Sequence, residues 1–88
     1  MKIKDGYMLR ELDDMAIVVA VGKRAVEFNG MITLNSLGTF IWKCLSADTT
    51  EEEILTNILN EYDVDYDCAK KDLSDFLKKI RDAGLIDE

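Results

Sequence analysis

The stretch "MITLNSLGTFIW" (residues 31–42) contains the point where a strand pattern gives way to a helix pattern. Its first four residues, 31–34, are apolar or β-branched and therefore favour a strand. From Leu37 onward, apolar residues recur three, four, seven and eight positions later, which is the spacing of one helix face. Asn35, a favourable N-cap residue, stands between the two patterns. The sequence therefore predicts a strand that runs directly into a capped helix.

The same stretch raises a second interpretation, because Asn35-Ser36-Leu37 is close to Asp-Ser-Leu, where acyl carrier proteins receive a phosphopantetheine arm. Ser36 would occupy the first turn of the helix, as a carrier requires. However, Asn35 replaces the aspartate, and carriers are all-helical, whereas residues 15–34 predict strands. A carrier modified at Ser36 is therefore a less favoured alternative.

Upstream of this junction the chain has the features of an antiparallel meander. Residues 7–12 alternate loosely, and residues 15–21 are β-branched and almost wholly apolar. Asp13-Asp14 provides a turn between them. Together with residues 31–34, these segments predict a three-stranded antiparallel sheet.

One part of the meander leaves the pairing open. Asn29-Gly30 is a strong hairpin dipeptide, because both residues tolerate positive φ, and it separates residues 25–28 from residues 31–34. If 25–28 paired with 31–34, a different strand edge would be free. The sequence does not decide which edge that is.

Downstream, two more helices are expected. Thr50 followed by Glu53 forms a capping box at the start of the second helix. The third helix is expected over about residues 66–83, with Gly84 as its C′ residue. The predicted fold is α+β and winged helix-turn-helix-like: one domain, residues 1–88, with an N-terminal three-stranded antiparallel sheet followed by three helices.

The charge and composition disfavour several classes of function. The formal net charge is -7, from 18 acidic and 11 basic residues, which disfavours nucleic acid and anionic membranes as partners. A winged helix nevertheless suggests a DNA-binding regulator, which stays as an alternative. The basic residues of the third helix are interleaved with aspartates, however, and such a helix binds phosphate poorly.

Catalysis, cofactors and metals find little support. The chain has no histidine, the commonest general base and metal ligand, and no Gly-rich phosphate loop, so we expect neither an enzyme nor a cofactor. Asp63, Asp65 and Asp67 resemble the start of a calcium loop, but Cys68 and Ser74 stand where the glycine and glutamate belong, so no metal site is expected. Cys44 and Cys68 are expected to be buried thiols.

The remaining class is a binding module. No apolar run approaches a membrane span, and residues 1–12 are too charged for a signal peptide, so a cytoplasmic protein is expected. If residues 31–34 form an edge strand beside the third helix, the two make a groove. An extended peptide could add there as a further strand. The same edge permits strand exchange between copies, which leaves a homodimer open.

An ordered set of residues resembles the PqqD-like family, the RiPP recognition elements, over roughly residues 7–87. The matching positions are Leu34-Asn35, Gly38, Ile41-Trp42, Thr50 to Ile54, Tyr62, Val64, Asp72-Leu73, Phe76-Leu77 and Gly84-Leu85-Ile86.

The resemblance implies a non-catalytic peptide chaperone. Such domains bind the leader segment of a ribosomally synthesised precursor peptide and present it to a modifying enzyme, often a radical-SAM maturase. The leader adds as a strand beside the third β-strand and lies against the third helix. Carried over to this sequence, the backbone ladder would come from Met31, Ile32 and Thr33, and the groove wall from Asp72, Leu73, Phe76, Lys79 and Ile80. The third helix would also be expected to bury Leu73, Phe76 and Ile80 in a core, and the first helix would be expected to bury Trp42.

Overall fold

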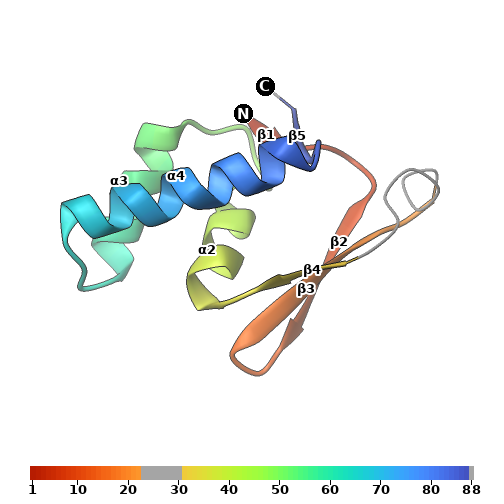
Figure 1. Cartoon of the computed structure of the whole chain (residues 1–88), viewed down its shortest axis with the longest axis horizontal. Helices are drawn as coiled ribbons and strands as arrows, with labels where there is room; N and C mark the ends of the chain where they lie inside the picture. The colour runs from red at the N-terminus through yellow and green to blue at the C-terminus, as the bar shows by residue number, and fades with distance from the viewer. Residues whose placement is uncertain (23–30, 88) are drawn as a thin grey trace.

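A three-stranded antiparallel sheet occupies one part of the molecule and three helices the other (Figure 1). The computed structural model describes residues 1–22 and 31–87. The predicted strand at 25–28 and the Asn29-Gly30 turn lie outside the described residues. The strands of this sheet are β2 (Tyr7–Leu12), β3 (Met15–Ala20) and β4 (Met31–Leu34), in the order β2-β3-β4.

The register of the sheet follows from the turn between β2 and β3. Asp13 has φ 39°, a left-handed conformation that aspartate tolerates better than most residues. This turn pairs Leu12 with Met15 and Leu9 with Val18. On its other side β3 pairs with β4, so that Val18 lies opposite Ile32. The predicted sheet is confirmed, and among the described strands β4 lies at an edge.

The three predicted helices are confirmed. They are α2 (Ser36–Cys44), α3 (Glu51–Glu61) and α4 (Tyr66–Asp82). The Asn35 side chain caps α2 as expected, since its Oδ1 accepts a hydrogen bond from the Gly38 N–H at 2.8 Å. Thr50 Oγ1 accepts from the Glu53 N–H at 3.1 Å. The Glu53 carboxylate, which a capping box would direct at the Thr50 N–H, accepts from the Thr49 hydroxyl at 2.9 Å.

The C-terminal end of α4 is closed by a Schellman motif. Gly84 adopts φ 77°, its N–H donates to the Arg81 carbonyl at 2.9 Å, and the Leu85 N–H donates to the Ile80 carbonyl at 3.0 Å. Leu85 and Ile80 are both fully buried, which supplies the hydrophobic contact that accompanies this motif. The predicted role of Gly84 is confirmed.

A second, two-stranded sheet was not predicted from the sequence. Strand β1 (Lys2–Ile3) pairs antiparallel with β5 (Ile86–Asp87), so the two ends of the chain lie side by side (Figure 1). Two residues a side are too few for a visible period-2 pattern. The pairing also depends on the Schellman turn, which directs the chain back after α4.

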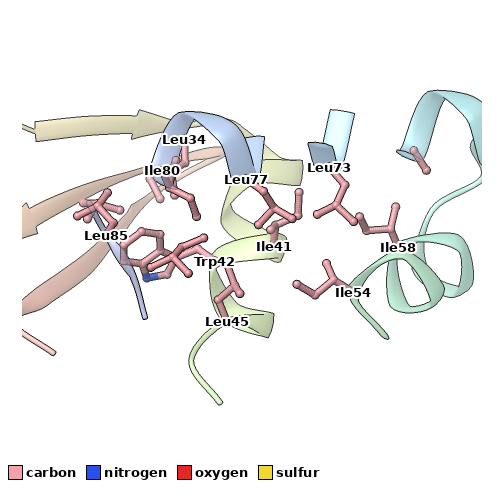
Figure 2. Packing of buried hydrophobic residues seen from close by; sticks show 14 residues of the cluster. Leu34, Ile41, Trp42, Leu45, Ile54, Ile58, Leu73, Leu77, Ile80 and Leu85 are labelled. Atoms are coloured by element: carbon pink, nitrogen blue, oxygen red, sulfur yellow. The ribbon is translucent and has the colours of Figure 1, made fainter. Parts of the chain in front are cut away.

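The core lies between the sheet and the helices (Figure 2). Ala16 and Val18 of β3 and Leu34 of β4 contribute one face of the sheet, and Trp42 of α2 is 5% exposed, as expected for a core residue. Full burial of one Val or Leu side chain stabilises the fold by roughly 1.5–3 kcal/mol. The remaining buried apolar residues are Ile41, Leu45, Ile54, Ile58, Ala69, Leu73, Leu77, Ile80, Leu85 and Ile86.

None of the helices in the described part of the chain is long and apolar enough to cross a membrane.

Candidate peptide-binding groove

A groove runs between the edge strand β4, the start of α2 and one side of α4. It consists of two hollows of about 300 Å³ and about 130 Å³, which share Asn35, Gly38, Phe76 and Lys79. We name it the β4–α4 groove. Its lining residues are Thr33, Leu34, Asn35, Leu37, Gly38, Ile41, Asp72, Asp75, Phe76 and Lys79.

Gly38 of α2 lies close to Phe76 of α4 in the groove. A Cβ placed on Gly38 would lie 3.2 Å from Cε1 of Phe76, 3.3 Å from Oδ1 of Asn35 and 3.4 Å from Cβ of Leu34. Contacts of this length are tighter than most side chains make, so a larger residue here would have to displace its neighbours. The absence of a side chain at position 38 therefore lets the Phe76 ring sit close to α2.

Phe76 forms the apolar wall of the groove. The ring is half-buried: it packs against the core on one side and lines both hollows on the other. Leu37 and the buried Ile41 add apolar surface from α2. The groove therefore offers an apolar side chain of a bound peptide a partly enclosed contact surface.

Charged side chains border the groove along α4. Asp75 pairs with Lys71 at 2.8 Å, and this ion pair raises the pKa of Lys71. Asp72 and Lys79 are exposed, and within residues 1–22 and 31–87 neither forms an ion pair. Besides the Asp75–Lys71 pair, the rim thus carries one carboxylate and one ammonium group without an ion-pair partner among the described residues, which a polar peptide can reach.

The edge strand offers backbone groups beside this groove. Residues 31–33 are paired with β3 on one side, Met31 with Val19, Ile32 with Val18 and Thr33 with Ile17. In an antiparallel ladder, alternate residues direct both backbone groups to the partner strand and the residues between direct theirs outward. Since β4 is the last described strand of its sheet, the outward groups of this edge are not used by another described strand.

The structure separates the residues that were predicted for this site. Asp72, Phe76 and Lys79 line the groove, as does Thr33. Leu73 and Ile80 are 0% exposed, so their side chains belong to the core and not to the groove surface. The reason is geometric: the centre of the apolar stripe of α4 points directly at α2, α3 and the sheet, and only its flank faces the groove.

The sequence did not single out α2 as a wall of the groove. Asn35 was assigned only a capping role, and Gly38 entered only as part of a family pattern. Leu37 was placed only on the apolar face of the first helix; it is half-buried against the core and lines the groove. The direct passage from strand to helix at Asn35 was the available indication, because it brings the first turn of α2 next to the edge of β4.

A separate hollow of about 230 Å³ lies on the other flank of α2, beside the turn between β2 and β3. The hollow is lined by Ser36, Asp13, Asp14 and Lys43, among others. Lys43 forms an ion pair with Glu11. Ser36 begins α2 one residue after strand β4 in a mixed α+β fold, so the all-helical frame of an acyl carrier is absent from the described residues. This disfavours the carrier interpretation.

The cysteines do not provide a reactive centre. Both are free thiols, but Cys68 is exposed and Cys44 half-buried, so the prediction of buried thiols is wrong for Cys68. Cys68 directly precedes the buried Ala69 in α4. Adjacent residues of a helix point about 100° apart, so the Cys68 side chain points away from the buried stripe. The Asp65 carboxylate nearby raises the pKa of the Cys68 thiol, which lowers its thiolate fraction. In the described part of the chain no group of His, Cys, Asp or Glu is arranged to hold a metal ion.

Comparison with known families agrees with this geometry. The family described as "Coenzyme PQQ synthesis protein D (PqqD)" matches residues 11–86. The chain belongs to the PqqD family. The match spans β3, β4 and all three helices, together with the last two residues of β2, and so includes the β4–α4 groove. No curated protein matches the sequence.

Two solved structures resemble this PqqD-family chain over nearly its whole length. TbiB1, in complex with the TbiA(beta) leader peptide, has a TM-score of 0.77 and 29% identity, over 97% of this chain and 93% of TbiB1. The lasso peptide synthetase B1, complexed with the leader peptide, has a TM-score of 0.72 and 14% identity, over 96% of this chain and 93% of the other. At 14% identity the second likeness concerns the fold alone. The predicted fold class and family are confirmed.

Proposed function

We propose that this domain binds the leader segment of a ribosomally synthesised precursor peptide and presents the precursor to a modifying enzyme. The leader adds as a strand to the outer edge of β4 and places its side chains in the β4–α4 groove. The observation that carries the proposal is the coincidence of two features: an edge strand without a further described neighbour, and a partly apolar groove with a charged rim beside the C-terminal half of that strand.

The comparisons support this proposal from a second direction. TbiB1 and the lasso peptide synthetase B1 were both solved with leader peptides, and both share the fold of this chain. The chain itself supplies backbone groups for affinity and a groove for selectivity, and these requirements differ from those of catalysis. We accordingly propose that it is not an enzyme, uses no cofactor and acts in the cytoplasm, with a radical-SAM maturase as the modifying partner.

The roles of individual residues follow from their places. Met31, Ile32 and Thr33 provide the ladder to the leader. Phe76 contacts its apolar side chains, and Asp72 and Lys79 at the rim contact its polar or charged groups. Leu73 and Ile80 act beneath the surface by holding α4 in place.

The central test is a titration of the domain with a fluorescently labelled leader from the precursor gene beside its own, followed by anisotropy. We expect saturable binding that a scrambled leader of the same composition does not show. Failure of the leader to bind, with the modifying enzyme present as well as absent, would refute the proposal.

Two proline variants test strand addition itself. Ile32→Pro and Thr33→Pro each remove one backbone donor, and by the alternation of the ladder one donor faces β3 and the other faces outward. We expect one variant to lose leader binding with a nearly unchanged melting temperature, and the other to lose stability. Retention of wild-type affinity by both variants would move the site away from β4.

A charge pair tests the groove wall. Lys79→Glu changes a groove residue, whereas Lys78→Glu makes the same change at the neighbouring exposed position of α4. We expect Lys79→Glu to change the affinity for the leader and Lys78→Glu to leave it unchanged. A DNA-binding domain would instead show equal, salt-dependent losses of duplex binding for both.

A further inference from the structure

The face of the sheet that points away from the core is mostly apolar. The strand register places eight residues on it: Met8, Arg10, Leu12, Met15, Ile17, Val19, Met31 and Thr33. Six of the eight are apolar. We name this set the outer sheet face. Met8, Val19 and Met31 form one row across all three strands, and Leu12 lies opposite Met15 at the turn.

These side chains are largely open to solvent. Met8 is 46% exposed, Leu12 51%, Met15 41% and Met31 63%. Four of the seven large apolar side chains that are exposed in the described part of the chain therefore gather on this one face. Exposed apolar side chains that gather on one face of a small domain are typical of a protein–protein contact, whereas scattered single residues are not.

The residue types favour an adaptable contact with another protein. Three of the four methionines of the chain stand on the outer sheet face. Methionine is unbranched and polarisable, and it is common on binding surfaces that must fit a partner of different shape. If this face bound no partner, alanine or polar residues would suit its half-exposed positions better than methionine.

The outer sheet face is continuous with the proposed leader site. Met31 and Thr33 belong to it through their side chains, and their strand β4 is the one to which the leader would add. An added leader strand would lie in the same sheet and widen this face by one strand. A partner seated on the face would therefore contact the domain and the bound leader together.

Charge distinguishes two candidate occupants, a second copy of this chain and the modifying enzyme. Each copy carries a formal charge of -7, and Asp13 and Asp14 stand at the end of this face, so two copies would repel one another. A partner with an apolar patch bordered by Lys and Arg would instead match both the apolar surface and its acidic end.

We propose that the outer sheet face docks the modifying enzyme, through an apolar patch with a basic rim, at a position where the enzyme also contacts the leader strand on β4. This inference rests on the proposed function. It has a thermodynamic consequence: leader and enzyme bind with positive and reciprocal coupling, because each contributes surface to the site of the other.

Leu12→Lys and Met8→Lys test the docking face, because both residues lie on β2, the strand farthest from the leader edge. Val64→Lys is the matched control: Val64 is 45% exposed and precedes α4, away from the sheet. For each variant, affinity for the labelled leader is measured first, and then affinity for the purified enzyme encoded beside the precursor gene, by biolayer interferometry with and without leader.

We expect Leu12→Lys and Met8→Lys to weaken enzyme binding by about tenfold or more, since a charge is placed within an apolar contact. Val64→Lys should bind the enzyme with nearly wild-type affinity, and all three variants should keep their affinity for the leader. The leader should tighten binding of the enzyme to the wild-type domain.

Unchanged enzyme binding in both β2 variants would overturn the inference. So would a wild-type dimer, seen by light scattering, that Leu12→Lys dissociates, because the face would then belong to a second copy. A wild-type domain that does not bind the leader is a separate result, and it would refute the proposed function.

Discussion

The two faces of the three-stranded sheet are made of the same kinds of residue and have opposite surroundings. On the inner face, Ala16 and Val18 are fully buried against the helices. On the outer face, Met15 and Met31 are 41% and 63% exposed. Successive positions of one strand thus alternate between a side that stabilises the fold and a side available for binding. The comparison shows that apolar content alone does not separate these roles in a domain of this size.

The β4–α4 groove stands between these extremes. Phe76 packs on the core with one side of its ring and lines the groove with the other. Its neighbours Leu73 and Leu77 on α4 are fully buried. A residue of this kind contributes both to stability and to binding, so its two contributions have to be measured separately.

The largest expected effect concerns the two faces of one strand. Leu34→Ala removes a side chain that is 2% exposed on the inner face, and we expect a loss of roughly 2–4 kcal/mol in the free energy of unfolding. Met31→Ala removes an exposed side chain on the outer face and should cost less than about 0.5 kcal/mol. Urea denaturation followed by circular dichroism measures both. Similar losses for the two variants would contradict the assignment of the faces.

The second prediction asks which face Phe76 resembles. Because the ring is half-buried, we expect Phe76→Ala to cost about 1–2.5 kcal/mol of stability, less than full burial would imply, and to weaken leader binding by about tenfold. Leu59→Ala is the control, since Leu59 is half-buried against the core on α3, away from the groove. It should lose stability and keep leader affinity. Equal affinities for the two variants would remove Phe76 from the site.

The smallest expected effect is at Gly38. Gly38→Ala gains about 1 kcal/mol of helix propensity in α2, and the 3.2 Å approach to Phe76 offsets that gain, so the melting temperature should change little. The displaced ring should narrow the groove and weaken leader binding by a few-fold. Unchanged affinity, measured by the same titration, would show that the leader does not reach this part of the groove.

Local features of the structure were predictable because they depend on neighbouring residues. The cap at Asn35, the turn at Asp13-Asp14 and the helix end at Gly84 each follow from one or two side chains and their backbone preferences. The periodicity of α4 likewise identified its apolar stripe. It did not separate Phe76 from Leu73 and Ile80, because the direction of the stripe relative to β4 is not a property of the helix alone.

The sequence by itself determined the class of fold, the order of the three main strands and the three helices, and the resemblance to the PqqD family. These depend on periodicity, capping and turn residues, all of which act over a few positions. Only the tertiary structure decided that β4 lies at an edge of the described sheet, that α2 as well as α4 lines the groove, and that no described element covers the apolar outer sheet face. The physical reason is that edges, grooves and exposed faces arise from the packing of segments far apart in the chain, and each segment carries the same apolar residues whether or not a neighbour covers it.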